Sequence, residues 1–222
     1  MIGDFLLSIW RALPTGLLFA RGVVMVGAFT AHELAHGLAA TAFGDPTPHE
    51  RGRLTLNPVR HLESLGVLLG ILVGVGWSRP TPIRPYQMRK PEWLGGLIAA
   101  LAGPAASLLL AVAGAAALRQ WGLVQEQPWH DWPTLAGWLT VWSNFNLMLA
   151  ALNLLPLFPL DGFTAIHNVL PLRASAWWEQ MSAWTTLVFG VAIFAGLWMP
   201  TPWLVSLATP VIRWLQHAAF GW

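Results

Sequence analysis

The chain has 222 residues, of which 55% are hydrophobic and only 10% are charged, and its mean hydropathy is +0.55. This composition excludes an ordinary soluble domain and predicts an all-α polytopic membrane protein. The formal net charge of +2 is small and the basic residues are spread between apolar stretches, which argues against a nucleic-acid partner. Because the chain contains no cysteine, any metal ion would be held by histidine and carboxylate side chains.

Residues 1–14 predict a helix that lies in the membrane interface. Asp4 precedes the first basic residue, Arg11, and no small-residue cleavage site follows, so the segment is not typical of a removable signal peptide. Trp10 and Arg11 suit the headgroup region, and we expect the helix to end near Pro14.

The next apolar stretch, residues 22–43, predicts a membrane helix about 33 Å long that contains His-Glu-Leu-Ala-His at residues 32–36. Residues i and i+4 share one helix face, so His32 and His36 can offer two imidazoles to one Zn²⁺. Glu33 would lie beside that metal, where its carboxylate can take a proton from an attacking water. A chance match is the alternative. However, Glu33 would lie about 15 Å from the end of the helix, and ionisable side chains at that depth are usually functional.

Residues 65–77 are apolar, but at about 13 residues they are too short for an ordinary membrane span. Basic residues flank the stretch on both sides, namely Arg51, Arg53, Arg60, Arg79, Arg84, Arg89 and Lys90. This charge pattern favours a re-entrant segment with both loops in the cytosol over a short tilted span. Residues 53–56 alternate as in a strand and, with the run near Pro82, could offer an edge to an unwound substrate; a plain loop is the alternative. We therefore expect a short membrane-associated β-rich or re-entrant segment between the first two main helices.

Further helices are predicted over residues 94–118, 134–155 and 177–199, and residues 203–220 form either a last short span or a surface helix. The small residues at 102–107 allow another helix to pack closely against the first of these. The whole pattern predicts about four to six membrane helices in one domain over residues 1–222.

A second motif, Asn-Leu-Leu-Pro-Leu-Phe-Pro-Leu-Asp-Gly at residues 153–162, ends the preceding helix with two prolines. Non-helical backbone at membrane depth is tolerated where it is buried in protein or faces water, so the motif predicts a cavity. Asp161 suits a third metal ligand, because a catalytic zinc takes three protein ligands and leaves a position for water. Alternatively, Asp161 caps a helix over residues 163–169, and the residues themselves leave both roles open.

These motifs resemble the paired signatures of the site-2 proteases, which are intramembrane zinc metalloproteases. HELAHG at residues 32–37 and NLLPLFPLDG at residues 153–162 stand in the family's order. GRLTLNPVRHLE from residue 52, GWSRPTPIRP from residue 76 and LAGPAASLLLA from residue 101 are similar to a compact bacterial and archaeal branch without PDZ or CBS domains. The resemblance covers residues 22–162. The sequence departs from the family's pattern directly after Asp161-Gly162, where Phe163-Thr164-Ala165 follows, and this leaves the ligand positions intact.

The resemblance implies that His32, His36 and Asp161 bind zinc and that Glu33 is the catalytic general base. Residues 22–162 would form the catalytic core, followed by C-terminal helices over residues 163–222. The protein would hydrolyse peptide bonds within or near a transmembrane helix of another membrane protein, such as a single-pass regulator, in regulated intramembrane proteolysis. It would lie in the plasma membrane as a multi-pass protein with its active site open to the cytosol, and a second copy of the chain is a further candidate partner. The alternative function is a noncatalytic zinc-binding membrane protein that binds or regulates a partner.

Three further residues are weaker candidates. Asn146 and Asn153 are seven residues apart on one predicted helix face, where they could bind a substrate strand or stabilise an oxyanion; hydrogen bonding to helix backbone is the alternative. We favour the functional role for Asn153 and the structural role for Asn146. His61 could orient a neighbouring group, although an ordinary interfacial histidine is favoured, and His167 has no ligand partner at useful spacing.

Overall fold

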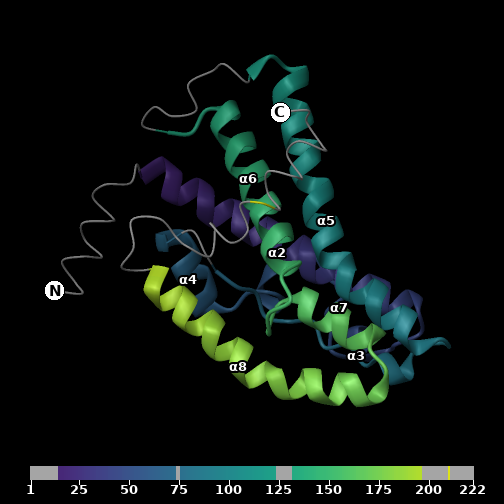
Figure 1. Cartoon of the computed structure of the whole chain (residues 1–222). Helices are drawn as coiled ribbons and strands as arrows, with labels where there is room; N and C mark the ends of the chain where they lie inside the picture. The colour runs from purple at the N-terminus through teal and green to yellow at the C-terminus, as the bar shows by residue number, and fades with distance from the viewer. Residues whose placement is uncertain (1–14, 74–75, 124–131, 197–209, 211–222) are drawn as a thin grey trace.

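The structure is a computed structural model of the chain, and it describes residues 15–73, 76–123, 132–196 and 210 (Figure 1). The interfacial helix predicted over residues 1–14 therefore lies outside the described residues. The last span or surface helix predicted over residues 203–220 also lies outside them, apart from Pro210. The regular elements of the described part are all helices: α2 (Thr15–Ala42), α3 (Thr47–Glu50), η1 (Pro58–Arg60), α4 (Ser64–Val73), η2 (Pro85–Gln87), α5 (Glu92–Gln120), α6 (Leu135–Asn153), α7 (Asp161–Val169) and α8 (Leu172–Gly196). The prediction of an all-α membrane protein is confirmed.

Three of the described helices, α2, α5 and α6, are long and apolar enough to cross a membrane. Helix α5 packs against both α2 and α6, as Figure 1 shows. The core between α2 and α6 includes Met25 and Phe29 from α2 and Phe145 and Leu149 from α6, with Phe29 and Phe145 in edge-to-face contact at 5.6 Å. The expected total of four to six membrane helices stays a prediction, because part of the C-terminal region lies outside the described residues.

The two ends of the apolar segment between α2 and α5 lie next to each other. Helix α4 forms its first half, and an isolated antiparallel bridge joins Leu62 before α4 to Ser78 after it. Gly66 allows this close return, because a Cβ at that position would collide with the backbone carbonyl of Trp77. The described part of this segment holds no β-strand: residue 53 has no regular structure and residues 54–56 form bends, so the plain-loop alternative holds there.

The turn between α6 and α7 is formed by the proline-rich motif. Helix α6 begins after Thr134, whose hydroxyl accepts a hydrogen bond from the Gly137 amide, and it ends at Asn153. Helix α7 then begins at Asp161, so the aspartate is placed in its first turn. Helix α8 lies against α7, where the Trp178 indole stacks on Phe163 at 4.9 Å and donates a hydrogen bond to its carbonyl.

Candidate metal centre

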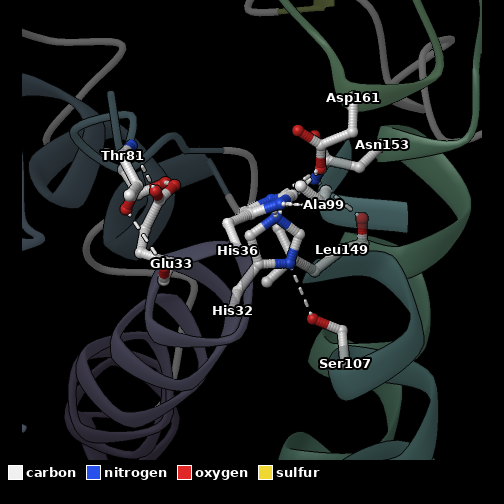
Figure 2. A network of polar contacts seen from close by, with 10 residues as sticks. His32, Glu33, His36, Thr81, Ala99, Ser107, Leu149, Asn153 and Asp161 are labelled. Carbon is white, nitrogen blue, oxygen red and sulfur yellow. Dashed lines mark hydrogen bonds and ion pairs between the residues drawn. The ribbon is translucent and has the colours of Figure 1, made fainter. Parts of the chain in front are cut away.

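The structure brings His32, His36 and Asp161 together, although 125 residues separate His36 from Asp161 in the sequence (Figure 2). The Asp161 Oδ2 atom lies 3.1 Å from His32 Nε2 and 3.2 Å from His36 Nε2, and the two Nε2 atoms are 3.1 Å apart. Both histidines are buried, at 3% and 5% exposure. Helix α2 therefore supplies two donor atoms one turn apart, and α7 supplies a third from the opposite side.

Helix α5 orients both imidazoles through their second nitrogen. His36 Nδ1 lies 2.7 Å from the Ala99 carbonyl oxygen, and His32 Nδ1 lies 2.9 Å from the Ser107 hydroxyl. A carbonyl oxygen only accepts hydrogen bonds, so His36 Nδ1 carries a hydrogen and donates it. In the neutral ring, His36 Nε2 then carries no hydrogen, and its lone pair faces the Asp161 carboxylate. Two acceptor atoms at this separation need a proton or a cation between them.

Gly103 lets α5 approach this close to the histidines. A Cβ at this position would lie 2.7 Å from His32 Nε2 and closer still to His36 Nε2. An alanine side chain would therefore occupy the space in front of both donor atoms. The small-residue stretch predicted to allow close packing does so at the position where two imidazoles converge.

Asp161 directs its carboxylate to the histidines instead of capping a helix. Leu160 is the residue before the first turn of α7, and no side-chain capping bond is formed there. The Asp161 side chain keeps 20% of its surface exposed, and it lines the open space described below.

Glu33 points away from the imidazoles and toward the segment after α4, as Figure 2 shows. The Ser78 hydroxyl donates to Glu33 Oε1 at 2.6 Å, and the Thr81 backbone amide donates to Oε2 at 2.7 Å. The Thr81 hydroxyl also donates to the Glu33 backbone carbonyl at 3.0 Å. The carboxylate is buried, at 5% exposure for the residue, and its direction is fixed by these two donors.

A cavity of about 730 Å³ connects these groups. Its wall includes Glu33, His36 and Asp161, so the candidate base and two candidate ligands face one space. The wall also contains other polar side chains, namely those of Thr81, Glu92, Thr164, His167, Asn168 and Ser175. The predicted cavity beside the proline-rich motif is present, with Phe158 and Pro159 in its wall.

Comparison with known proteins identifies the family. The chain is 35% identical over 179 residues to the "Putative zinc metalloprotease YwhC" of Bacillus subtilis, which covers 79% of this chain and 80% of the relative. The chain belongs to this zinc metalloprotease family. It is also 35% identical over 143 residues to the "Putative zinc metalloprotease Rip2" of Mycolicibacterium smegmatis, covering 61% of this chain and 51% of that protein. No protein-family model matches the chain, and no solved structure matches it significantly.

The donor set of this zinc metalloprotease homologue fits a zinc ion. Two imidazole nitrogens and one carboxylate oxygen are the ligands of many catalytic zinc sites, whereas a structural site is usually closed by four ligands. Within the described ranges, His32, His36 and Asp161 are the one group of three or more potential ligands, and their donor atoms all lie within 4.8 Å of one another. The convergence of three potential ligand atoms on a buried point is favourable around a cation.

Each of the weaker candidates, Asn146, Asn153 and His61, forms a side-chain hydrogen bond to a backbone carbonyl. The Asn153 amide donates to the Leu149 carbonyl at 2.9 Å, and the Asn146 amide donates to the Trp142 carbonyl at 2.9 Å, both within α6. His61 is fully buried, and its Nε2 donates to the Thr55 carbonyl at 2.8 Å, so it holds the loop before α4 in place.

Sequence reasoning missed several residues that surround the donor atoms. Ser78 and Thr81 bind Glu33, and Ser107 binds His32. His167 lines the cavity, although its spacing in the sequence indicates no ligand partner. Ser78 and Thr81 stand in the GWSRPTPIRP stretch, and Ser107 stands in LAGPAASLLLA. Both stretches contributed to the resemblance, and their position between the two metal motifs was the available signal.

Proposed function

We propose that this protein is an intramembrane zinc metalloprotease of the site-2 protease type. It hydrolyses peptide bonds within or near a transmembrane helix of a membrane-protein substrate, in regulated intramembrane proteolysis. The observation that carries this proposal is a buried cluster of potential ligand atoms: His32 and His36 lie on α2, which is long and apolar enough to cross the membrane, and Asp161 reaches them from α7. A protease whose donor atoms lie at that depth acts on peptide bonds that reach the same depth.

In this proposal His32 and His36 hold the zinc through Nε2, and Asp161 holds it through its carboxylate. The Ala99 carbonyl and the Ser107 hydroxyl keep the two rings in the orientation that directs Nε2 inward. When bound, zinc supplies a Lewis acid that polarises the substrate carbonyl and lowers the pKa of water.

Glu33 acts as the general base and then as the general acid. Its carboxylate takes a proton from the attacking water and delivers that proton to the leaving amine nitrogen. Ser78 and Thr81 determine where this carboxylate lies before reaction, and Glu33 shares the cavity wall with His36 and Asp161.

The substrate helix must unwind before it is cut, because an intact helix engages its carbonyl groups in backbone hydrogen bonds. The cavity of about 730 Å³ offers room for an unwound segment next to Glu33 and Asp161. Asn153 directly precedes the proline-rich motif and has a second amide hydrogen beyond the one given to Leu149, which suits it to bind a substrate carbonyl. We place the protein in the plasma membrane as a multi-pass protein, with this cavity open toward the cytosol.

Cleavage of a model transmembrane substrate by the purified zinc-loaded protein tests the proposal. Replacing Glu33 with Gln should lower cleavage by roughly 10²- to 10⁴-fold, because the general base is lost. Bound zinc, measured by elemental analysis, should stay unchanged, because Glu33 is not a ligand. Glu92→Gln removes another carboxylate from the same cavity wall and should leave cleavage near the wild-type rate.

The same assay separates the alternative function. A noncatalytic zinc-binding membrane protein would retain zinc and show no cleavage in the wild type or in either variant. Equal cleavage by the wild type and Glu33→Gln would instead show that another group acts as the base.

A further inference from the structure

Arginine side chains enclose a second pocket on the other side of the segment that holds Glu33. This pocket has a volume of about 330 Å³ and is lined by Arg51, Arg53, Arg60, Arg79 and Arg84, together with Pro80. These five arginines are a large share of the chain's 12 lysine and arginine residues. In the described part of the chain no carboxylate lines the pocket, and none pairs with these guanidinium groups.

Arg53 holds the pocket together. Its guanidinium donates hydrogen bonds to the backbone carbonyls of Arg60 and Arg79, so the stretches before and after α4 converge on one cation. Burial lowers the pKa of Arg53 from its ordinary value; Glu33 raises it, and the charges of Arg79 and Arg60 lower it again. The fold thus concentrates positive charge at close range, and an anion with several oxygen atoms would relieve this repulsion.

Exposed apolar side chains stand on the same loop. Leu56 is 75% exposed and Val59 is 72% exposed, and both lie between Arg53 and Arg60 in the sequence. On helix α4, Leu65 and Leu68 are also about half exposed, at 54% and 52%. Apolar side chains that alternate with arginines are typical of segments that enter the boundary between lipid headgroups and acyl chains.

We propose that this arginine pocket binds the phosphate group of one anionic phospholipid, while Leu56 and Val59 enter the acyl region beside it. Guanidinium groups bind phosphate oxygens in pairs with two parallel hydrogen bonds, and basic pockets of membrane proteins attract anionic headgroups. An acidic peptide segment would satisfy the same charges but would leave the two exposed apolar side chains without a role. The bilayer supplies both the phosphate and the acyl chains.

Occupation of the pocket would bear on the neighbouring cavity. The two spaces share Pro80, and Arg53 binds the carbonyl of Arg79, which follows Ser78 in the chain. A bound headgroup would therefore steady the stretch that orients Glu33. This lipid site does not depend on the proposed protease activity, and binding alone can test it.

The test measures lipid binding by the full-length protein in a neutral detergent. Native mass spectrometry during titration with phosphatidylglycerol and phosphatidylcholine should show one retained phosphatidylglycerol per chain and little phosphatidylcholine. The double variant Arg60→Gln/Arg84→Gln should bind phosphatidylglycerol roughly 25-fold more weakly, at about fivefold for each lost charge. The matched control is Arg119→Gln. Arg119 is an exposed arginine in the last turn of α5 and does not line the pocket, so this variant should bind phosphatidylglycerol as the wild type does.

A second variant tests the apolar part without changing charge. Leu56→Ser/Val59→Ser should also weaken phosphatidylglycerol retention, and thermal unfolding should show that both double variants fold. Equal retention of the two lipids, or unchanged binding by Arg60→Gln/Arg84→Gln, would overturn the proposal. Displacement of the lipid by an equal concentration of inorganic phosphate would assign a free-phosphate site instead, and displacement by hexaglutamate would assign an acidic-peptide site.

Discussion

At the scale of single residues, the orientation of the two histidines depends on a helix that supplies no ligand. Helix α5 contributes a carbonyl to His36, a hydroxyl to His32 and, at Gly103, the space in front of both rings. These contacts select the ring nitrogen that faces Asp161. A change in α5 should therefore affect metal affinity without removing a donor atom.

Replacing Gly103 with Ala should weaken zinc binding by roughly 10- to 100-fold, as losses of supporting groups around a metal do. The added methyl group would lie 2.7 Å from His32 Nε2, which forces at least one ring to move. Zinc affinity measured by competition with a chelator checks this. Gly190→Ala is the matched control, because a Cβ there meets no atom within 4 Å. Equal zinc affinity in both variants would show that the rings tolerate the displacement.

Replacing Ser78 with Ala removes one of the two donors that fix the Glu33 carboxylate. A hydrogen bond to a charged group contributes about 1.5–3 kcal/mol, so we expect kcat for a model substrate to fall about tenfold or more. KM and bound zinc should change little, because the Ser78 hydroxyl bonds to Glu33 and to none of the three candidate ligands. Ser78→Thr restores the hydroxyl and should recover most of the rate. A higher KM with unchanged kcat would indicate that Ser78 acts on substrate binding.

At the scale of elements, the turn between α6 and α7 carries Asp161 across to the histidines. Gly162 follows Asp161 and packs against backbone, where a Cβ would lie 2.5 Å from the carbonyl oxygens of both Leu154 and Leu155. Backbone atoms cannot rotate away as a side chain can. The position of α7 relative to the end of α6 therefore depends on the absence of a side chain at this residue.

Replacing Gly162 with Ala should destabilise the protein by about 1–3 kcal/mol and should also lower zinc affinity. The reason is that the first turn of α7 must shift, and Asp161 shifts with it. Thermal unfolding and zinc titration of the purified variant measure the two effects. Unchanged stability and affinity would show that the turn adapts to the methyl group without moving α7.

The sequence predicted helix bounds, residue roles and side-chain contacts with different accuracy. The helices predicted over residues 94–118 and 134–155 agree with α5 and α6 to within two residues at each end, because apolar length alone reveals a membrane helix. The helix predicted over residues 22–43 ends one residue from the observed end, but α2 begins seven residues earlier, at Thr15. The role of Asp161 stayed open from the residues, since a carboxylate before a helix suits a cap as well as a ligand. The contacts of Ser78 and Ser107 were missed because they join segments far apart in the chain, and no local pattern encodes such pairings.

At the scale of the whole molecule, the candidate metal centre joins two distant parts of the chain. Helix α2 supplies two donor atoms, α7 supplies one, and α5 packs against both helices. In the described part of the chain, few other contacts join α2 directly to α7. An ion that binds all three donors therefore links α2 to α7.

Zinc should accordingly stabilise the folded protein, because the folded state binds it at a site that the unfolded chain lacks. At a free zinc concentration about 100 times the dissociation constant, the expected gain is about 2.7 kcal/mol, seen as a higher unfolding temperature in detergent. Asp161→Asn should lose most of this gain, because a neutral amide is a poor zinc ligand. Glu33→Gln should keep it in full, since that side chain faces Ser78 and Thr81. If zinc raised the unfolding temperature of Asp161→Asn as much as that of the wild type, Asp161 would not be a ligand and the link between α2 and α7 would have to come from packing on α5 alone.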